Sequence, residues 1–165
     1  MQVVLVAHNI RSTHNVGSLL RTADGLGVST VYLTGYTPYP LLKNDPRLPH
    51  LVTKLDKHIH KTALGAEKSQ HWQHEPDVFT LIQKLRSDGF TICALEQSRS
   101  SIPLPEFKPP NNVAIIVGRE VEGLEPDVLQ AADHILEIPM HGKKESFNVA
   151  QAAAMALYQL VFRVK

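Results

Sequence analysis

A strand–helix–strand pattern at the start of the chain constrains the fold more than any other feature. Residues 2–7 form a continuous apolar run, which is typical of a strand buried on both faces of a parallel sheet. Apolar residues then recur at helical spacing from Val16 to Leu26, and Gly27 stands where that helix would end. Residues 29–34 are rich in β-branched and aromatic residues and predict a second strand. Because a helix joins the two strands, the unit predicts a right-handed crossover and a parallel sheet.

The rest of the chain continues the alternation of strands and helices. Further strands are predicted over 89–95, 112–117 and 134–138, and helices over 75–87, over 126–132 and after residue 148. Residues 35–60 contain four prolines and little periodicity, so we expect a loop there, and a second loop over 98–112. The 165 residues show no repeat and no domain boundary. We therefore expect one α/β domain over 1–165, with a parallel sheet of at least five strands flanked by helices.

Composition narrows the class of protein. The only cysteine is Cys93, so an internal disulfide is excluded and a reducing compartment is expected. We see no signal peptide and no apolar stretch near the roughly 20 residues of a membrane helix, so we expect a soluble, cytoplasmic protein. The net charge of +1 excludes neither RNA nor a small ligand. Residues 43–68, however, hold six Lys or Arg against three acids, which fits either a phosphate-binding surface or a solvated loop.

Three polar loops follow predicted strands, over residues 8–15, 118–124 and 139–148. In an open parallel sheet these loops leave the same edge and can converge on a ligand. Their glycines fit neither a dinucleotide fingerprint nor a Walker loop. Ser146 lacks evident triad partners, and Cys93 lies in an apolar strand, where a core role is expected. The histidine pairs lack a third ligand at a recognised spacing, so we expect no metal.

The same loops carry three motifs of one family. Residues 9–23 read NIRSTHNVGSLLRTA, residues 118–124 read GREVEGL, and residues 138–150 read IPMHGKKESFNVA. In this order they resemble the three motifs of the SpoU–TrmH RNA methyltransferases, and the resemblance spans nearly the whole chain. The departures are Phe147, where leucine is commoner, and Ala150, where serine is common.

The resemblance implies an α/β knot, with a deep trefoil knot over approximately 90–165 and no separate RNA-binding domain. It implies S-adenosylmethionine (SAM) as cofactor, a homodimer that completes the active site, and methyl transfer to a ribose 2′-hydroxyl of tRNA or rRNA. Two alternatives stay open: methylation of an RNA base, and a catalytically silent RNA-binding factor. The sequence does not tell tRNA from rRNA, which nucleotide is methylated, or whether a protein partner exists.

Site residues follow from the motifs. The resemblance assigns catalysis to polar residues of the three motifs: Asn15, Arg21, Glu120, Ser146 and Asn148. Arg21 is expected to stabilise the developing alkoxide, with a phosphate assisting removal of the proton. Whether the arginine itself acts as the base is left open. An apolar slot with backbone hydrogen bonds is expected to hold the cofactor, at Leu95, Gly118, Ile138, Met140 and Phe147. RNA contacts are expected at Arg11, Lys54, Lys57 and Lys61. Because a sulfonium is already electrophilic, the reaction needs no metal.

Overall fold

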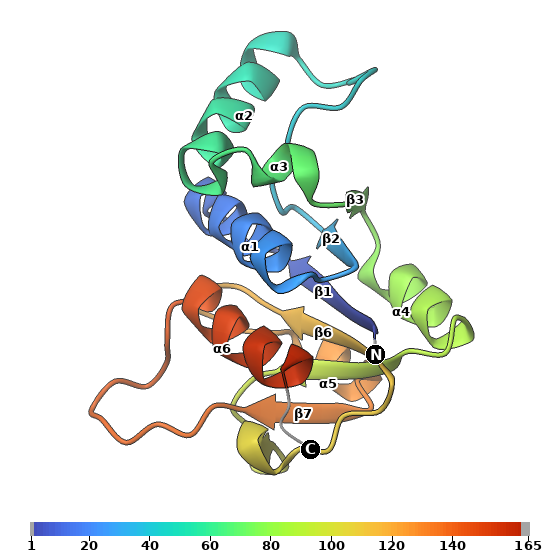
Figure 1. Ribbon diagram of the computed structural model, residues 1–165, viewed down its shortest axis with the longest axis vertical. Helices are drawn as coiled ribbons and strands as arrows, with labels where there is room; N and C mark the ends of the chain where they lie inside the picture. Colours follow the sequence, from blue (N-terminus) through green and yellow to red (C-terminus); the bar gives the residue numbers. More distant parts are fainter. Residues whose placement is uncertain (1, 163–165) are drawn as a thin grey trace.

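A parallel sheet of seven strands forms the centre of the structure, a computed structural model that describes residues 2–162 (Figure 1). The strand order is β3-β2-β1-β6-β4-β7-β5, and every neighbouring pair is parallel. The strands are β1 (Gln2–His8), β2 (Thr30–Thr34), β3 (Trp72–Glu75), β4 (Thr91–Leu95), β5 (Ile102–Pro103), β6 (Asn112–Val117) and β7 (His134–Glu137). The sequence prediction of an α/β fold with a parallel sheet is confirmed.

Helices cover both faces of the sheet (Figure 1). Alternate residues of β1 point to opposite faces: Val3 and Leu5 join one apolar cluster, and Val4 and Val6 join the other. The first cluster includes α1 (Thr13–Leu26) and α6 (Val149–Val161), and the second includes α4 (Val78–Ser87) and α5 (Pro126–Ala131). The remaining helices are α2 (Pro49–Ala63), α3 (Ala66–Ser69) and the 3₁₀ turn η1 (Leu104–Glu106).

The first helix begins and ends as its sequence predicts. Ser12 caps α1 by accepting a hydrogen bond from the backbone N–H of Asn15, and Gly27 ends the helix in the left-handed conformation at φ 69°. No sequence signal pointed to a special role of Gly17, but this residue permits close packing of α1 against α2. A Cβ at this position would collide with the Ile59 carbonyl and the Thr62 side chain.

The prediction of a loop through residue 60 was wrong, because α2 begins at Pro49. Proline is well suited to the first turn of a helix, where its missing N–H needs no partner. The buried residues Val52, Ile59 and Ala63 then follow at helical spacing and face α1. The prolines therefore indicated a loop only up to the start of this helix.

Two short strands were also missed. β3 is a polar edge strand that pairs only with β2, so it lacks the apolar run of a central strand. The helix that follows begins at Val78 rather than Glu75, because Asp77 caps it by accepting from the backbone N–H groups of Phe79 and Thr80. β5 and η1 lie in the expected loop 98–112 and are too short to give a sequence signal.

Within residues 2–162, no helix has the length and apolar character needed to cross a membrane.

Candidate active site

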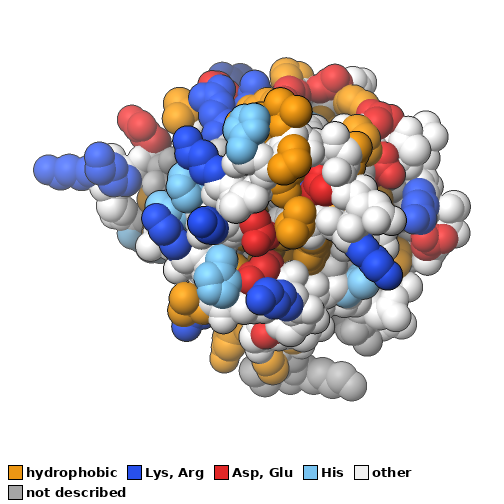
Figure 2. All heavy atoms as spheres, turned by 90° about the horizontal axis from the view of Figure 1, so that it is seen from above, with side chains coloured by type: hydrophobic (Ala, Val, Ile, Leu, Met, Phe, Trp, Pro, Cys, Tyr) orange, Lys and Arg blue, Asp and Glu red, His pale blue; other side chains and the backbone are white. Residues whose placement is uncertain are grey.

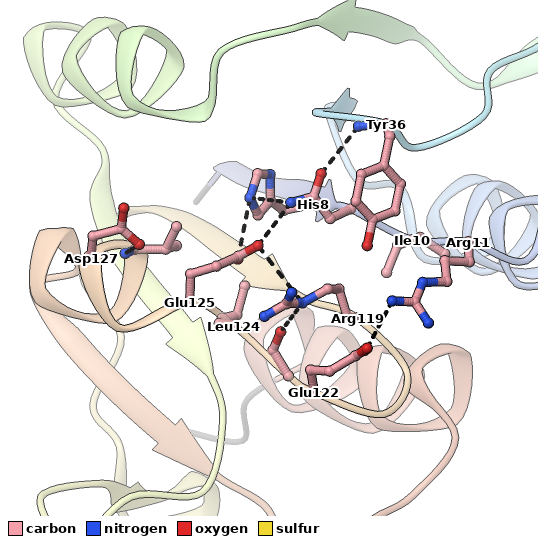
Figure 3. A network of polar contacts seen from close by, with 12 residues as sticks. His8, Ile10, Arg11, Tyr36, Arg119, Glu122, Leu124, Glu125 and Asp127 are labelled. Atoms are coloured by element: carbon pink, nitrogen blue, oxygen red, sulfur yellow. Dashed lines mark hydrogen bonds and ion pairs between the residues drawn. The ribbon is translucent and has the colours of Figure 1, made fainter.

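The three polar loops meet at the carboxyl edge of the sheet. Residues 9–12 follow β1, residues 118–125 follow β6, and residues 138–148 run from β7 to α6 as the long loop at the left of Figure 1. β1 and β6 are neighbours, which places the first two loops together. Figure 3 shows side chains of these two loops pointing toward one another.

Glu120 is the centre of the contact between these loops. Its carboxylate accepts hydrogen bonds from the backbone N–H groups of Arg11 (3.3 Å) and Ser12 (3.1 Å) and from Nδ2 of Asn15 (3.0 Å). Burial acts to raise the pKa of Glu120, but the hydrogen bonds from Asn15 and the backbone outweigh it, so the pKa lies below its ordinary value. The carboxylate is therefore ionised at neutral pH.

Asn148 extends this contact to the third loop. Its Nδ2 donates to Oδ1 of Asn15 at 3.2 Å, and its own Oδ1 accepts from the N–H of Ala150 at 2.9 Å, which caps α6. The Asn15 amide is thus oriented at both ends, with its NH₂ toward Glu120 and its oxygen toward Asn148. The structure brings together three of the five predicted catalytic residues, and we call Asn15, Glu120 and Asn148 the polar clamp.

A cavity of about 170 Å³ borders the polar clamp, because Glu120 is also part of its wall. Ser146, the fourth predicted catalytic residue, lines the same cavity from the loop before α6. Four of the five residues predicted for the cofactor line it as well: Leu95, Gly118, Ile138 and Phe147. Met140 is not among the lining residues. The wall therefore combines apolar side chains with backbone at the ends of β4, β6 and β7.

Gly118 is required by the packing of its own loop. A Cβ at this position would lie 2.7 Å from Cδ2 of Leu124 and 3.0 Å from the backbone carbon of Gly123. A larger residue would therefore displace the loop as well as fill the cavity, and a loss of ligand binding alone would not tell the two effects apart.

Sequence reasoning missed Glu96, which lines the cavity at the end of β4. Its Oε2 accepts from the backbone N–H of Leu124 at 3.0 Å. Gly123 has φ +71°, and a Cβ there would collide with the same carboxylate oxygen. Glu96 thus fixes the far end of the 118–124 loop. Its position directly after an apolar strand, as in the three polar loops, is the signal that could have found it.

Arg21 is placed apart from the clamp. It is exposed on α1 and is not among the residues that line the cavity. Six residues separate it from Asn15, which is about one and two-thirds helical turns, so the two side chains leave α1 in different directions. Within residues 2–162 of one chain, no hydrogen bond joins Arg21 to the polar clamp.

A second, partly buried polar cluster surrounds Glu125 at the end of the 118–125 loop (Figure 3). Nδ1 of His8 is 2.8 Å from Oγ1 of Thr34, and Nε2 of His8 is 3.4 Å from Oε2 of Glu125. Asn9 donates to the other Glu125 oxygen at 2.9 Å, and Arg119 approaches it at 3.7 Å. Burial lowers the pKa of His8, although the Glu125 carboxylate opposes this shift. No sequence pattern pointed to this cluster.

The predicted RNA-binding residues fall in two places. Lys54, Lys57 and Lys61 are exposed on α2 at spacings of three and four residues, so they share one side of the helix. We call these three lysines the basic face. Figure 2 views the α2 end of the molecule and shows Lys, Arg and His side chains beside a band of hydrophobic ones. Arg11 belongs instead to the 9–12 loop, where its guanidinium pairs with Glu122 at 2.7 Å.

Neither a metal centre nor a cysteine nucleophile is found among residues 2–162. No group of three or more His, Cys, Asp or Glu side chains in this part of the chain could hold a metal ion. Cys93 is buried, and this burial raises the pKa of its thiol to about 12. The thiol is therefore protonated at neutral pH and unsuited to nucleophilic attack.

The chain is similar to known proteins over most of its length. The profile described as the SpoU rRNA Methylase family matches residues 2–158. A tRNA (guanosine(18)-2'-O)-methyltransferase of Borreliella burgdorferi is 29% identical over 165 residues, which cover 99% of this chain and 67% of that protein. The protein of the same name from Aquifex aeolicus is 29% identical over 160 residues, covering 95% and 67%.

Solved structures share the fold. An AdoMet-bound rRNA methyltransferase from Sinorhizobium meliloti superposes with a TM-score of 0.80 at 21% identity, covering 96% of this chain. This chain spans 55% of the length of that one. The TrmH/SpoU tRNA modifying enzyme of A. aeolicus gives a TM-score of 0.77 at 23% identity, covering 96% of this chain and 73% of that one.

Proposed function

The chain belongs to the SpoU rRNA Methylase family, and on this basis we propose that it transfers a methyl group from SAM to a ribose 2′-hydroxyl of tRNA or rRNA. The observation that carries the proposal is the polar clamp beside the cavity. Glu120 lies in the wall of a partly apolar hollow and holds Asn15, which in turn accepts from Asn148, so polar groups distant in sequence are fixed next to that hollow, as a group-transfer site requires. The names of the B. burgdorferi and A. aeolicus relatives support ribose as the acceptor.

The cavity wall suits an adenosyl group. Leu95, Ile138 and Phe147 supply apolar surface, and the backbone around Gly118 supplies hydrogen-bonding groups. When bound, SAM supplies a methyl group on an electrophilic sulfonium. The work left to the protein is to place the ribose hydroxyl, accept its proton and stabilise the resulting alkoxide.

Residues of the chain divide this work. Asn15 is fixed in orientation by Glu120 and Asn148 and holds a rigid amide against Glu120 of the cavity wall, and Ser146 adds a hydroxyl on that wall. Arg21 carries a permanent charge and supplies the stabilisation of the alkoxide, while a phosphate of the RNA next to the reacting ribose takes the proton of the hydroxyl. Its exposed position, away from the clamp of its own chain, supports a role in the site of a second subunit.

A homodimer is part of the proposal. Three large apolar residues recur at helical spacing on the exposed side of α6: Met155, Tyr158 and Phe162. The rings of Tyr158 and Phe162 contact each other, with their centroids 5.2 Å apart, and both side chains are more than half exposed. A second copy would cover this stripe. Because α1 packs beside α6, the same contact would bring Arg21 of one chain toward the partner.

The course of the chain supports a trefoil knot over approximately 90–165. Residues 96–111 leave β4, pass β7 to form the edge strand β5, and return to β6 in the middle of the sheet. The chain then goes out to β7, and α6 returns to pack between α1 and η1, which belongs to the earlier excursion. We propose that residues 139–162 pass through the loop formed by residues 96–111; the last three residues of the expected knot lie outside the described part of the chain.

RNA contacts in this proposal belong to the catalytic domain itself, at Arg11 and the basic face. The domain over 1–165 then contacts both the cofactor and the RNA. The expected location is the cytoplasm, where tRNA and rRNA are found.

A methyl-transfer assay tests the function. The protein is incubated with radiolabelled SAM and with unmodified tRNA or rRNA, and the product is digested to nucleosides. We expect 2′-O-methylated nucleosides from the natural chain, and none from Arg21→Ala with SAM affinity retained. Label in a base would show that the enzyme methylates a base. A folded dimer that binds RNA but neither binds SAM nor transfers label would be a silent RNA-binding factor. Loss of SAM binding in Arg21→Ala would place Arg21 in the cofactor site.

A further inference from the structure

A second groove lies at the ends of β1 and β2 and shares the 9–12 loop with the polar clamp. Its lining is aromatic and basic, and includes Arg11, Tyr36, Tyr39, Arg47 and His74. The backbone N–H of Arg11 donates to Glu120 of the clamp, so the groove and the candidate active site meet at this residue. None of the three family motifs includes the aromatic residues of the groove.

Among the aromatic rings that line the groove, Tyr36 is the most exposed. Tyr39 stacks on His74 with the ring centroids 4.0 Å apart, and the guanidinium of Arg47 lies 3.6 Å from the Tyr39 ring centroid. Arg47 is in turn held by Asp45 and by the Tyr39 and Pro40 carbonyls. Tyr36, by contrast, is 53% exposed.

The backbone holds Tyr36 rigidly. Its N–H donates to Oδ1 of Asn9 at 3.1 Å, and the preceding Gly35 has φ +63° with Asn9 packed where a Cβ would lie. The hydroxyl of Thr37 donates to the Ala7 carbonyl at 2.9 Å and accepts from the N–H of Ile10 at 3.0 Å. An exposed ring on a fixed backbone loses little freedom when a flat ligand stacks on it.

Arg11 provides a charge beside this ring. Its guanidinium is more than half exposed and pairs with the exposed Glu122, and such a pair contributes little to stability in water. Arg11 can therefore exchange Glu122 for a phosphate, which arginine binds in a two-pronged geometry. A flat aromatic platform next to an exchangeable arginine is the combination that proteins use for single-stranded nucleic acid.

We propose that this groove binds one unstacked RNA nucleotide, with its base on Tyr36 and its phosphate on Arg11. The proposal rests on RNA being the substrate, and it narrows that substrate to a single-stranded or loop region next to the methylated ribose. A continuous duplex would not offer a free base face to Tyr36.

Fluorescence titration tests the proposal with a single-stranded RNA of about twelve nucleotides that carries 2-aminopurine, and with the corresponding duplex. We expect quenching on the single strand and weaker binding of the duplex. Tyr36→Ala should lose the quenching and weaken binding about 5- to 100-fold, whereas Tyr36→Phe should keep both. The matched control is Phe79→Ala, which removes an exposed ring from α4 outside the groove. SAM affinity and the thermal midpoint of each variant verify that the protein is folded.

The outcomes separate this proposal from the proposed function. Equal RNA binding by the natural chain, Tyr36→Ala and Phe79→Ala would overturn the nucleotide site while leaving methyl transfer intact. No binding of either RNA by the natural chain would also overturn it, and would leave the groove as a surface for a protein. Tyr36-dependent quenching without methyl transfer to any RNA would support the site and reject the enzyme.

Discussion

Replacing Glu120 tests how far the polar clamp holds the candidate active site together. One oxygen of its carboxylate serves Ser12 and Asn15, and the other serves the N–H of Arg11. In Glu120→Gln, the amide oxygen can keep the first two bonds, but the new NH₂ group faces the Arg11 N–H, and the negative charge is lost. In Glu120→Ala all three donors lose their acceptor.

The magnitudes follow from hydrogen bonds to a charged acceptor, which contribute about 1.5–3 kcal/mol each when buried and less when part-exposed. Because Glu120 is only partly buried, we expect the free energy of unfolding to fall by about 1–2 kcal/mol in Glu120→Gln and by about 2–4 kcal/mol in Glu120→Ala. Release of the Asn15 amide should lower the transfer rate at least tenfold in Glu120→Ala, since about 1.4 kcal/mol of lost transition-state stabilisation suffices for that. The rate should fall less in Glu120→Gln, because its amide oxygen can keep the bond from Asn15.

Urea denaturation and the methyl-transfer assay measure the two effects. The control for the stability measurement is Glu122→Gln, two residues away, which removes an exposed pair with Arg11 and should change the free energy of unfolding by less than about 0.5 kcal/mol. The pKa of Glu120 is lowered in the folded state, so its contribution is present above its unfolded pKa and is lost as pH falls through the folded pKa. Equal losses of stability in Glu120→Gln and Glu122→Gln, or full transfer activity in Glu120→Ala, would refute the role of the polar clamp in holding the site together.

Three further predictions concern the rest of the chain. Burial lowers the pKa of His8, so the stability that depends on its neutral form is present above about pH 6.5 and falls as the pH drops. Chemical denaturation between pH 7 and 5 should therefore show a smaller decrease of the free energy of unfolding in His8→Asn than in the natural chain. Gly17→Ala should destabilise the protein by about 1–3 kcal/mol, because the added Cβ clashes with α2. Gly25→Ala, in open space on the same helix, should instead stabilise it by up to about 1 kcal/mol. Thermal unfolding of both variants distinguishes the effect of packing from that of helix propensity. Neutralising the basic face with three glutamines should weaken RNA binding and reduce the slope of log affinity against log salt by about 2–3, with SAM affinity unchanged; an unchanged slope would make these lysines part of a solvated surface.

The sequence predicted the sheet and the meeting of its loops because both follow from local patterns. Continuous apolar runs such as β1 indicate buried strands, and parallel strands necessarily place their following loops at one edge. The side chains of Asn15, Glu120 and Asn148 were assigned through motif resemblance, and the structure shows how they contact one another. The role of each in catalysis stays a prediction.

What the sequence could not supply are contacts between segments without a pattern of their own. α2 was missed because four prolines, three before the helix and Pro49 at its start, dominate the local composition. The residues that stabilise α2, such as Ile59, act by packing on α1 at Gly17. The position of Glu96 after an apolar strand marks it as a candidate, but its bond to Leu124 and the His8–Glu125 pair depend on distances between segments that no sequence spacing encodes. The position of Arg21 away from the clamp is likewise a property of the folded chain, and it makes a second subunit part of the proposed site.

Calorimetric titration of the folded protein with SAM tests the central claim most directly, because the cavity beside the polar clamp is proposed to hold this cofactor. The account predicts saturable binding of one SAM per chain, retained in Arg21→Ala. A folded dimer that binds no SAM at high micromolar concentration would contradict it.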